Sequence, residues 1–341
     1  MTLNMIARAA IAAAFSLTGT SAIGQSQGIA DPQRDGYYSA FDDKKVVFVP
    51  VALGFDLADG WYAGMKSQLE PLGIEVDVRD PNWSADAGSR AISALIGEKP
   101  DAIVVHNPDV QTYAKLIRRA EDAGIYVLQI NMKSAYPSTA FVGADWVSIG
   151  ARAAEIAVGQ CGDGTSGKLA IIQGPLTAAA SAYQMYGVDQ VLSAHPEIEV
   201  VSNQAADWDA SKARVITETT LQQNPDLCGI IGFWDGMDVG AGAAVKEAGR
   251  SDDVFVVTSG GGGKAGCDNL EAGLFDVNIS YDVPGQARDL SNTIQSMFQV
   301  GYEPGEHKFS LYTQLRTITR DNIEASRAQG SCWTVEDLQS E

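Results

Sequence analysis

The stretch GIIGFWDGMDVGAGAAV, residues 229–245, joins a short apolar run to a segment rich in Gly and Ala. A short apolar run bounded by a turn is typical of a buried strand, and the segment after it has the composition of a helix. Trp234 and Asp235 lie at the junction. Ligands bind at the carboxyl ends of the strands in open α/β sheets, so this pair indicates a binding site. Asp235 has an alternative role as the cap of the following helix.

The same alternation of strand and helix extends in both directions from this stretch. The first part of the chain has strand-like apolar runs at 44–53, 74–80, 101–108 and 125–131. The pattern restarts with a helix-like segment at 147–160 and five further runs at 168–174, 198–208, 228–235, 254–260 and 275–282. Continuous apolar strands between amphipathic segments predict parallel sheets covered on both faces. We therefore expect two α/β units of similar plan, with one more strand in 308–325 that fits neither unit as a separate domain.

The composition is that of a globular protein with an acidic surface. The chain has 341 residues, 45% of them hydrophobic and 20% charged, and a net charge of −19. This length is enough for two cores of typical domain size. The negative charge argues against nucleic acid and anionic membranes as partners, because both would repel the chain.

The first 24 residues have the pattern of a secretory signal peptide. Arg8 precedes an apolar run at 9–18, and the small residues Ala22 and Gly24 predict cleavage before Gln25. A buried helix is the alternative interpretation of the apolar run. Residues 25–43 are polar and aperiodic, so we expect a flexible leader there. The sequence thus predicts an exported protein.

Export changes the interpretation of the four cysteines, Cys161, Cys228, Cys267 and Cys332. An even number of cysteines in an oxidising compartment is consistent with two disulfides, for which three pairings exist. Cys161 and Cys228 each precede a predicted strand, which would place them at the same end of one sheet. This favours the pairs Cys161–Cys228 and Cys267–Cys332, with four buried thiols as the alternative.

Aromatic, carboxylate and amide residues recur at the carboxyl ends of several predicted strands. They are Phe55, Asp56, Asn131, Trp208, Trp234, Asp235 and Asp282. Such a set suits a site that stacks on a polar ring and hydrogen-bonds its hydroxyls, in a cleft between two lobes. Each residue also has a structural alternative: Asp56 as a helix cap and Trp208 as a core aromatic, for example. Asp209, before a helix-like segment, is interpreted as an N-cap.

Signs of catalysis are weak. His106, His195 and His307 are the three histidines, and no Ser–His–Asp arrangement can be recognised among them. The glycine-rich run at 259–266 lacks the Gly-Lys-Ser/Thr ending of a phosphate loop, and we expect it to turn close to the ligand or the other lobe. Asp56 and Asp235 could in principle hydrolyse a glycoside. Overall, we expect no enzyme, no metal and no cofactor.

Several segments resemble the ribose type of periplasmic sugar-binding protein, the receptor of an ABC importer. The resemblance runs from about Lys44 to about Ile323 and rests on matches at 64–76, 102–109, 173–188, 205–209, 235–249 and 281–287. It implies the type I periplasmic binding protein fold, in which two Rossmann-like lobes, each a parallel sheet flanked by helices, are joined by a three-strand hinge. The implied N-terminal lobe is 44–145 plus 284–309, and the implied C-terminal lobe is 146–283 plus 310–341. The crossings are expected near 143–146, 281–284 and 310–313.

The resemblance also implies ligand contacts at Phe55, Asn131, Gln184, Trp208, Trp234 and Asp282. The family usually has arginines at the positions of Met132 and Gln184, and it has asparagine where this chain has Trp234. Gln184 also has a structural alternative as a solvated helix residue. Fewer donors and an added aromatic ring favour a less hydroxylated ligand than ribose.

The expected function is therefore that of a monomeric periplasmic receptor that delivers a sugar, sugar alcohol or cyclitol to ABC permease subunits. A small cationic ligand is an alternative, because carboxylates beside tryptophans suit cation–π attraction. A sensor or chemoreceptor ligand-binding protein is a second alternative, and a glycoside-processing enzyme is a third.

Overall fold

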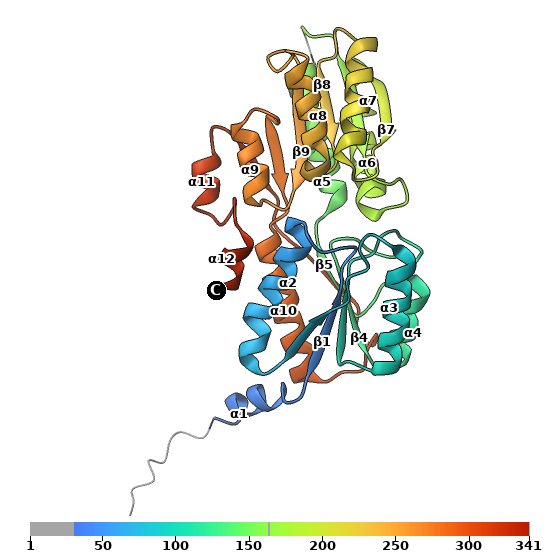
Figure 1. Cartoon of the computed structure of the whole chain (residues 1–341), viewed down its shortest axis with the longest axis vertical. Helices are drawn as coiled ribbons and strands as arrows, with labels where there is room; N and C mark the ends of the chain where they lie inside the picture. Colours follow the sequence, from blue (N-terminus) through green and yellow to red (C-terminus); the bar gives the residue numbers. More distant parts are fainter. Residues whose placement is uncertain (1–30, 163, 341) are drawn as a thin grey trace, which may run out of the picture.

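Two six-stranded sheets, each flanked by helices, form the two lobes of the protein (Figure 1). The computed structural model describes residues 31–162 and 164–340. In the first sheet the order is β11-β5-β4-β3-β1-β2, and every neighbouring pair is parallel. Its strands are β1 (Lys45–Val49), β2 (Glu75–Val78), β3 (Ala102–Val105), β4 (Tyr126–Ile130), β5 (Ala140–Gly143) and β11 (Phe309–Tyr312).

The second sheet has the order β12-β10-β9-β8-β6-β7, with only β12 antiparallel to its neighbour β10. Its strands are β6 (Lys168–Gln173), β7 (Glu199–Ala205), β8 (Gly229–Gly232), β9 (Phe255–Gly260), β10 (Val277–Ser280) and β12 (Arg316–Thr319). Central strands such as β3 and β8 are buried along their whole length. Burial on both faces explains why they are continuous apolar runs rather than alternating ones. The predicted α/β fold with two mostly parallel sheets is confirmed.

Helices cover both faces of each sheet (Figure 1). In the first lobe, α2 (Asp56–Leu69) packs against α10 (Val283–Val300), and α3 (Ala85–Glu98) packs against α4 (Ala114–Asp122). In the second lobe, α5 (Trp146–Cys161) packs against α6 (Ala179–Leu192), and α7 (Ala210–Gln223) packs against α8 (Asp235–Glu247). The short helix α9 (Lys264–Glu271) contacts α8 and β10. One hydrophobic cluster contains Phe48 of β1 and Ile171 of β6, so the apolar core extends through both lobes.

In the described chain, the backbone passes between the sheets at 144–145, 281–282 and 313–315. These crossings are hydrogen-bonded to one another through Thr313. Its backbone N–H donates to the carbonyl of Gly143 at 3.0 Å, and its hydroxyl donates to the carbonyl of Tyr281 at 2.8 Å. The three crossings therefore form one connected hinge.

The expected boundary of the second lobe at residue 310 was wrong in two respects. Strand β11 pairs with β5 in the first sheet, so the third crossing follows Tyr312. The C-terminal helix α12 (Val335–Gln339) packs against α2 of the first lobe, although α11 (Ile323–Arg327) contacts β12 of the second. The buried indole of Trp333 explains this return, because its ring lies against Gly60 of α2 and its Nε1 donates to the carbonyl of Gly261 at 3.0 Å.

The flexible leader expected at 25–43 is corrected for 31–43, the part of it that the structure describes. Residues Pro32–Ser39 form helix α1, which begins at the N-cap Asp31 with a proline in its first turn. Phe41 is buried in the core, and the Tyr37 hydroxyl donates to Gln295 of α10 at 2.8 Å. The predicted signal peptide at 1–24 lies outside the described residues.

Both predicted disulfides are present. Cys161, the last residue of α5, is bonded to Cys228 just before β8, and Cys267 of α9 is bonded to Cys332 in the C-terminal segment. Within the described ranges, the helices are all too short or too polar to cross a membrane.

Candidate ligand-binding cleft

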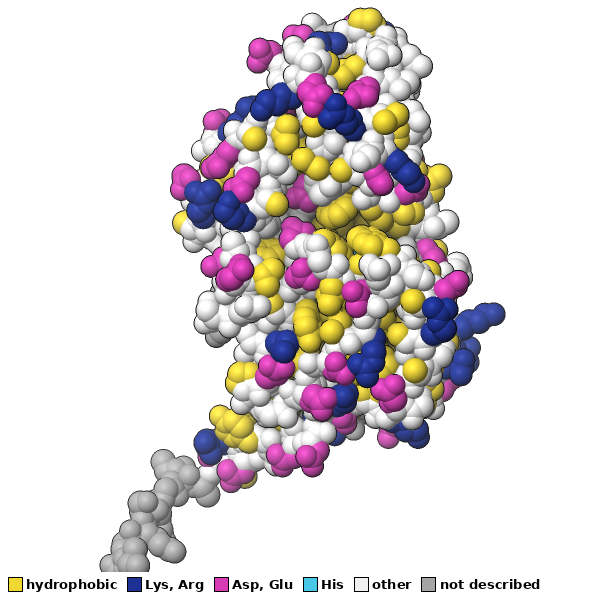
Figure 2. Space-filling model, in the orientation of Figure 1, with side chains coloured by type: hydrophobic (Ala, Val, Ile, Leu, Met, Phe, Trp, Pro, Cys, Tyr) yellow, Lys and Arg dark blue, Asp and Glu magenta, His cyan; other side chains and the backbone are white. Residues whose placement is uncertain are grey.

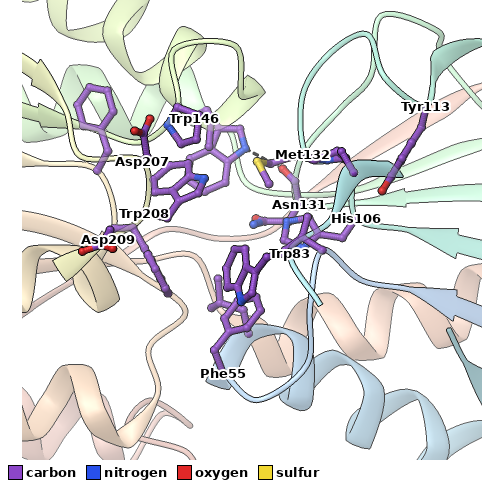
Figure 3. Close-up of a pocket in the computed structure, with 18 of the residues that line it drawn as sticks. Phe55, Trp83, His106, Tyr113, Asn131, Met132, Trp146, Asp207, Trp208 and Asp209 are labelled. Atoms are coloured by element: carbon purple, nitrogen blue, oxygen red, sulfur yellow. Dashed lines mark hydrogen bonds between the residues drawn. The ribbon is translucent and has the colours of Figure 1, made fainter. Parts of the chain in front are cut away.

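A cavity of about 560 Å³ lies between the two lobes and is lined by residues of both. Figure 2 shows hydrophobic side chains gathered around the hollow at the middle of the molecule. Figure 3 shows the cleft, with Phe55, Trp83 and Asn131 on the first lobe and Trp208 on the second. A concave, mostly apolar site with a few polar groups is what small-molecule binding requires.

Four aromatic rings form a continuous series across the cleft. The rings of Phe55 and Trp83 in the first lobe are stacked, with centroids 5.3 Å apart and planes at 30°. Phe55 meets Trp234 of the second lobe edge to face at 5.9 Å. Trp234 in turn meets Trp208 edge to face at 6.1 Å. The Phe55–Trp234 contact therefore brings the two lobes together at the cleft.

Local backbone geometry explains how these rings reach the cleft. Phe55 occupies the N-cap position of α2 in an extended conformation, directly after Gly54 at φ +86°. Trp83 and Trp208 both have positive φ, at +64° and +62°, in the turns that follow β2 and β7. The Trp208 ring packs directly over Gly174, where any Cβ would overlap it. Turns after parallel strands thus place aromatic residues at one edge of each sheet.

The cleft lining contains a few polar atoms that are buried and have no hydrogen-bond partner in the protein. They are Oδ1 of Asn131, both ring nitrogens of His106 and Nε1 of Trp234. Asn131 is 3% exposed and His106 is 2% exposed. Burial lowers the pKa of His106 to about 3, so its imidazole is neutral at physiological pH. Almost none of the surface of these atoms is accessible, so they are shielded even from water in the cleft.

The cleft has few charged side chains that are not already paired within the protein. Among the described residues, none of those that line it is Lys or Arg. The two lining carboxylates are engaged elsewhere: Asp207 pairs with Lys212 Nζ at 3.0 Å, and Asp209 caps α7 by accepting from the Lys212 N–H at 3.0 Å. The predicted N-cap role of Asp209 is confirmed.

Four of the predicted site residues, Phe55, Asn131, Trp208 and Trp234, line the cleft. Two others, Asp56 and Asp235, lie outside the lining. Asp235 is 4% exposed, and its Oδ2 accepts from Asn278 Nδ2 at 2.8 Å. Burial, reinforced by the negative charge of Asp56, raises the pKa of Asp235 to about 7. Burial also raises the pKa of Asp56, with Asp59 adding to the effect.

Gln184 and Asp282 also lie outside the lining, because both are used inside the protein. The buried Gln184 amide donates to the carbonyl of Phe233 at 3.2 Å and accepts from the Ser259 hydroxyl at 3.3 Å. Asp282 caps α10 by accepting from the Gly285 N–H at 3.3 Å, and it faces Arg316 at 3.5 Å. The predictions that placed these two residues at the ligand are therefore not supported by the geometry.

The glycine-rich run packs against the other lobe, one of the two roles predicted for it. A Cβ at Gly261 would overlap Leu57 of α2 in the first lobe, and a Cβ at Gly260 would overlap the Asp235 carboxylate. The loop is absent from the cleft lining. Its glycines therefore permit close packing of the lobes beside the cleft.

Sequence reasoning missed Trp83, His106 and Trp146 as lining residues. His106 directly follows β3, and Trp83 lies in the loop after β2. The strand-end rule used for Trp234 would have found both if it had been applied to every strand. Trp146 begins α5 at the first crossing, and its Nε1 donates to the carbonyl of Asn131 at 2.7 Å (Figure 3). No strand-end signal marks it.

Metal coordination has no support in the described ranges, where no group of three or more His, Cys, Asp or Glu side chains could hold an ion.

Comparison with known proteins identifies relatives of this chain. It is 28% identical to the xylitol-binding protein of Mycolicibacterium smegmatis over 213 residues, which cover 62% of this chain and 58% of that protein. It is 28% identical to the D-allose-binding periplasmic protein of Escherichia coli over 208 residues, covering 58% of this chain and 67% of that one. The chain thus aligns with only about 60% of the length of these relatives.

Solved structures show the same fold. The Caulobacter myo-inositol binding protein with bound myo-inositol superposes with a TM-score of 0.75 at 21% identity, covering 84% of this chain and 96% of that one. The two-lobed architecture that the resemblance implied is thus confirmed. The family described as "Periplasmic binding protein domain" matches residues 46–301, which is most of the chain. The protein belongs to this family of periplasmic binding proteins.

Proposed function

We propose that the protein is an exported solute-binding protein that holds a small, uncharged polyol or sugar between its lobes and delivers it to an ABC importer. The observation that carries the proposal is the cleft of about 560 Å³, walled by aromatic rings from both lobes. A ligand in this cleft contacts both lobes at once, so binding favours their closure about the hinge.

The chemistry of the lining supports a ligand with fewer hydroxyl groups than a typical sugar. The described lining has no Lys or Arg, and therefore no guanidinium fork to donate several hydrogen bonds. Tryptophan rings provide flat apolar faces for the carbon skeleton of a polyol or cyclitol. Relatives named for xylitol and D-allose, and a structure with bound myo-inositol, support the uncharged character of the ligand, although these molecules carry more hydroxyl groups than ribose.

The alternative of a cationic ligand is less favoured. Its strongest support was the combination of tryptophans with free carboxylates, but Asp207 is paired with Lys212 and Asp209 caps a helix. Glycoside hydrolysis requires two carboxyl groups that flank the scissile bond. Asp56 and Asp235, the pair considered for that role, lie outside the lining. Family membership also favours binding over catalysis.

The proposed function also implies a cellular location and partner proteins for this chain. We infer that the mature protein is a periplasmic monomer and that the closed form is recognised by permease subunits. A receptor for a sensor or chemoreceptor would present the same closed form, and pull-down of permease subunits by the ligand-loaded protein would distinguish the two.

A thermal-shift screen of the mature protein tests the proposed function. The probes are xylitol, myo-inositol, D-allose, D-ribose and choline. A polyol at 100 times its Kd should raise stability by about 2.7 kcal/mol, because it binds only the folded state. The absence of a shift with every polyol and sugar would count against the proposal, and a shift with choline alone would favour the cationic alternative.

Two variants then locate the site. Trp208→Ala and Trp234→Ala should each weaken binding of the probe found in the screen by about 1–3 kcal/mol, by analogy with the stacking of bases on aromatic rings. Tyr38→Ala is the control, since Tyr38 is an exposed aromatic residue of α1 outside the cleft. Unchanged affinity in a folded Trp234→Ala protein would remove that ring from the site.

A further inference from the structure

The C-terminal residues 332–340, called the interlobe strap below, cross the boundary between the lobes outside the cleft lining. Helix α11, just before the strap, belongs to the second lobe: it contacts β12, and its Arg327 forms an ion pair with Glu271 of α9 at 3.4 Å. Helix α12, at the end of the strap, packs against α2 of the first lobe (Figure 1). The strap therefore connects the two lobes in addition to the hinge crossings.

The second-lobe end of the strap is held by a disulfide and by backbone hydrogen bonds. Cys332 is bonded to Cys267 of α9. The Cys332 N–H donates to the carbonyl of Gly262 at 2.6 Å, and the Trp333 carbonyl accepts from the Lys264 N–H at 2.9 Å. This end of the strap is therefore fixed to the second lobe and moves with it.

The first-lobe end of the strap is held by apolar packing. The Trp333 ring approaches Gly60 of α2 so closely that a Cβ there would lie 2.5 Å from it. Leu338 of α12 is 4% exposed and belongs to the same hydrophobic cluster as Leu57 and Trp61 of α2. Apolar contacts of this kind can separate and form again without the breaking of a covalent bond, so this is the end of the strap that can detach.

Opening of the lobes must pull α2 away from the strap. Leu57 lies one helical turn before Gly60, and a Cβ at Gly261 of the second lobe would overlap its side chain. Phe55, two residues before Leu57, contacts Trp234 of the second lobe at 5.9 Å. A rotation that separates these interlobe pairs also separates α2 from the strap, because the strap stays attached to the second lobe. The contacts between the strap and α2 therefore belong to the closed arrangement of the lobes.

We propose that the interlobe strap stabilises the closed arrangement of the lobes and thereby raises ligand affinity from outside the cleft. The apparent Kd of a ligand equals its intrinsic Kd divided by the fraction of molecules that are competent to bind, so an element that favours closure lowers the apparent Kd. The disulfide Cys267–Cys332 contributes because it fixes the strap to the second lobe. The matched family domain ends at residue 301, before the strap begins. This inference rests on the proposed function, in which closure accompanies binding.

Two variants release the strap at its opposite ends. A chain that ends at Thr334 lacks α12, and the double variant Cys267→Ser/Cys332→Ser lacks the covalent anchor on the second lobe. Circular dichroism first establishes that each variant is folded. Small-angle X-ray scattering then measures the radius of gyration of the ligand-free proteins. The radius should be larger in both variants than in wild type, because their lobes are more often open.

Calorimetric titration measures the effect of the strap on binding. The probe is whichever of xylitol, myo-inositol, D-allose and D-ribose binds wild type most tightly. Its Kd should rise by about 5-fold or more in both variants, as expected when the coupling between closure and binding is weakened. The residues that line the cleft are unchanged, so the loss should appear mainly as faster dissociation, measured by stopped-flow tryptophan fluorescence.

The matched control is the double variant Cys161→Ser/Cys228→Ser. This disulfide joins α5 to the residue before β8 within the second lobe, and its sequence separation of 67 is close to the 65 of Cys267–Cys332. Its removal should destabilise the protein by a similar amount, because the entropy of loop closure depends on loop length. The radius of gyration and the Kd of this control should nevertheless equal those of wild type.

Three outcomes separate the inference from the proposed function. Equal radii of gyration and equal Kd values for wild type and a folded chain ending at Thr334 would overturn the role of the strap. Equal losses of affinity in the two disulfide variants would also overturn it, because the effect would then come from general destabilisation of the second lobe; this comparison decides if the shortened chain does not fold. Binding of no sugar or polyol to wild type would overturn the proposed function, while the scattering data would still test whether the strap holds the lobes together.

Discussion

Replacing Asp235 with asparagine should stabilise the protein, and the gain should grow as the pH rises. Asp235 begins α8 in the second lobe, where it is buried and accepts a hydrogen bond from Asn278. The charge of Asp56 acts on it from α2 of the first lobe. An asparagine keeps an oxygen that can accept from Asn278 Nδ2 and removes the buried charge.

The magnitude follows from the pKa. Burial and the charge of Asp56 raise the pKa of Asp235 from the usual 3.8 to about 7. Between these two values the folded chain retains a proton that the unfolded chain has released, so the stability that this group contributes is lost as the pH rises. One pKa unit corresponds to about 1.4 kcal/mol, so the full loss above pH 7 is about 4 kcal/mol. Between pH 5 and pH 8.5 the loss is about 3 kcal/mol.

Urea unfolding of wild type and Asp235→Asn at pH 5 and pH 8.5 measures this effect. The stability difference between the two proteins should be about 3 kcal/mol more in favour of the variant at pH 8.5 than at pH 5. Asp122→Asn is the control, because Asp122 is an exposed carboxylate 3.9 Å from Arg118. A difference independent of pH, or a variant that is less stable by the same amount at both values, would refute the reasoning.

Two further changes probe a disulfide of the second lobe and the packing of the C-terminal segment. Replacing Cys161 and Cys228 by serine opens a loop with a sequence separation of 67 and should lower stability by about 4 kcal/mol, measured by urea unfolding. Recovery of free thiols from the unreduced wild-type protein would contradict this. Trp333→Ala removes a buried indole and its hydrogen bond to Gly261, so it should cost about 3–5 kcal/mol. A loss below about 1 kcal/mol would show that the C-terminal segment contributes little to the core.

The alternation of strands and helices could be predicted from the sequence because it depends on local patterns. A strand buried on both faces must be apolar throughout, as 229–232 is in β8, and this requirement is visible without any knowledge of the neighbouring strands. The edge of each sheet that lines the cleft could be predicted from the same pattern, because parallel strands place the residues that follow them at one edge. Phe55, Asn131, Trp208 and Trp234 were found in this way, and all four line the cleft.

The lobe to which each part of the C-terminal segment belongs could not be predicted from its sequence. Residues 309–312 form a short strand that either sheet could accept, and the pairing with β5 depends on where α10 ends. Nothing in the sequence around Trp333 indicates that its ring packs against the first lobe. That contact is with Gly60 of α2, which lies far away in the sequence. Lobe boundaries therefore depend on contacts between residues that are far apart in the sequence.

The sequence by itself determined the two α/β units and the edge of each sheet that forms the cleft, because these follow from local patterns. It favoured the observed pairing of the cysteines but left other pairings open. The tertiary structure decided which polar groups find a hydrogen-bond partner inside the protein. Gln184 and Asp235 bond within the second lobe, whereas His106 has no partner in the protein and lines the cleft. The physical reason is that the groups that can satisfy a polar side chain lie far from it in the sequence and are brought together only by folding.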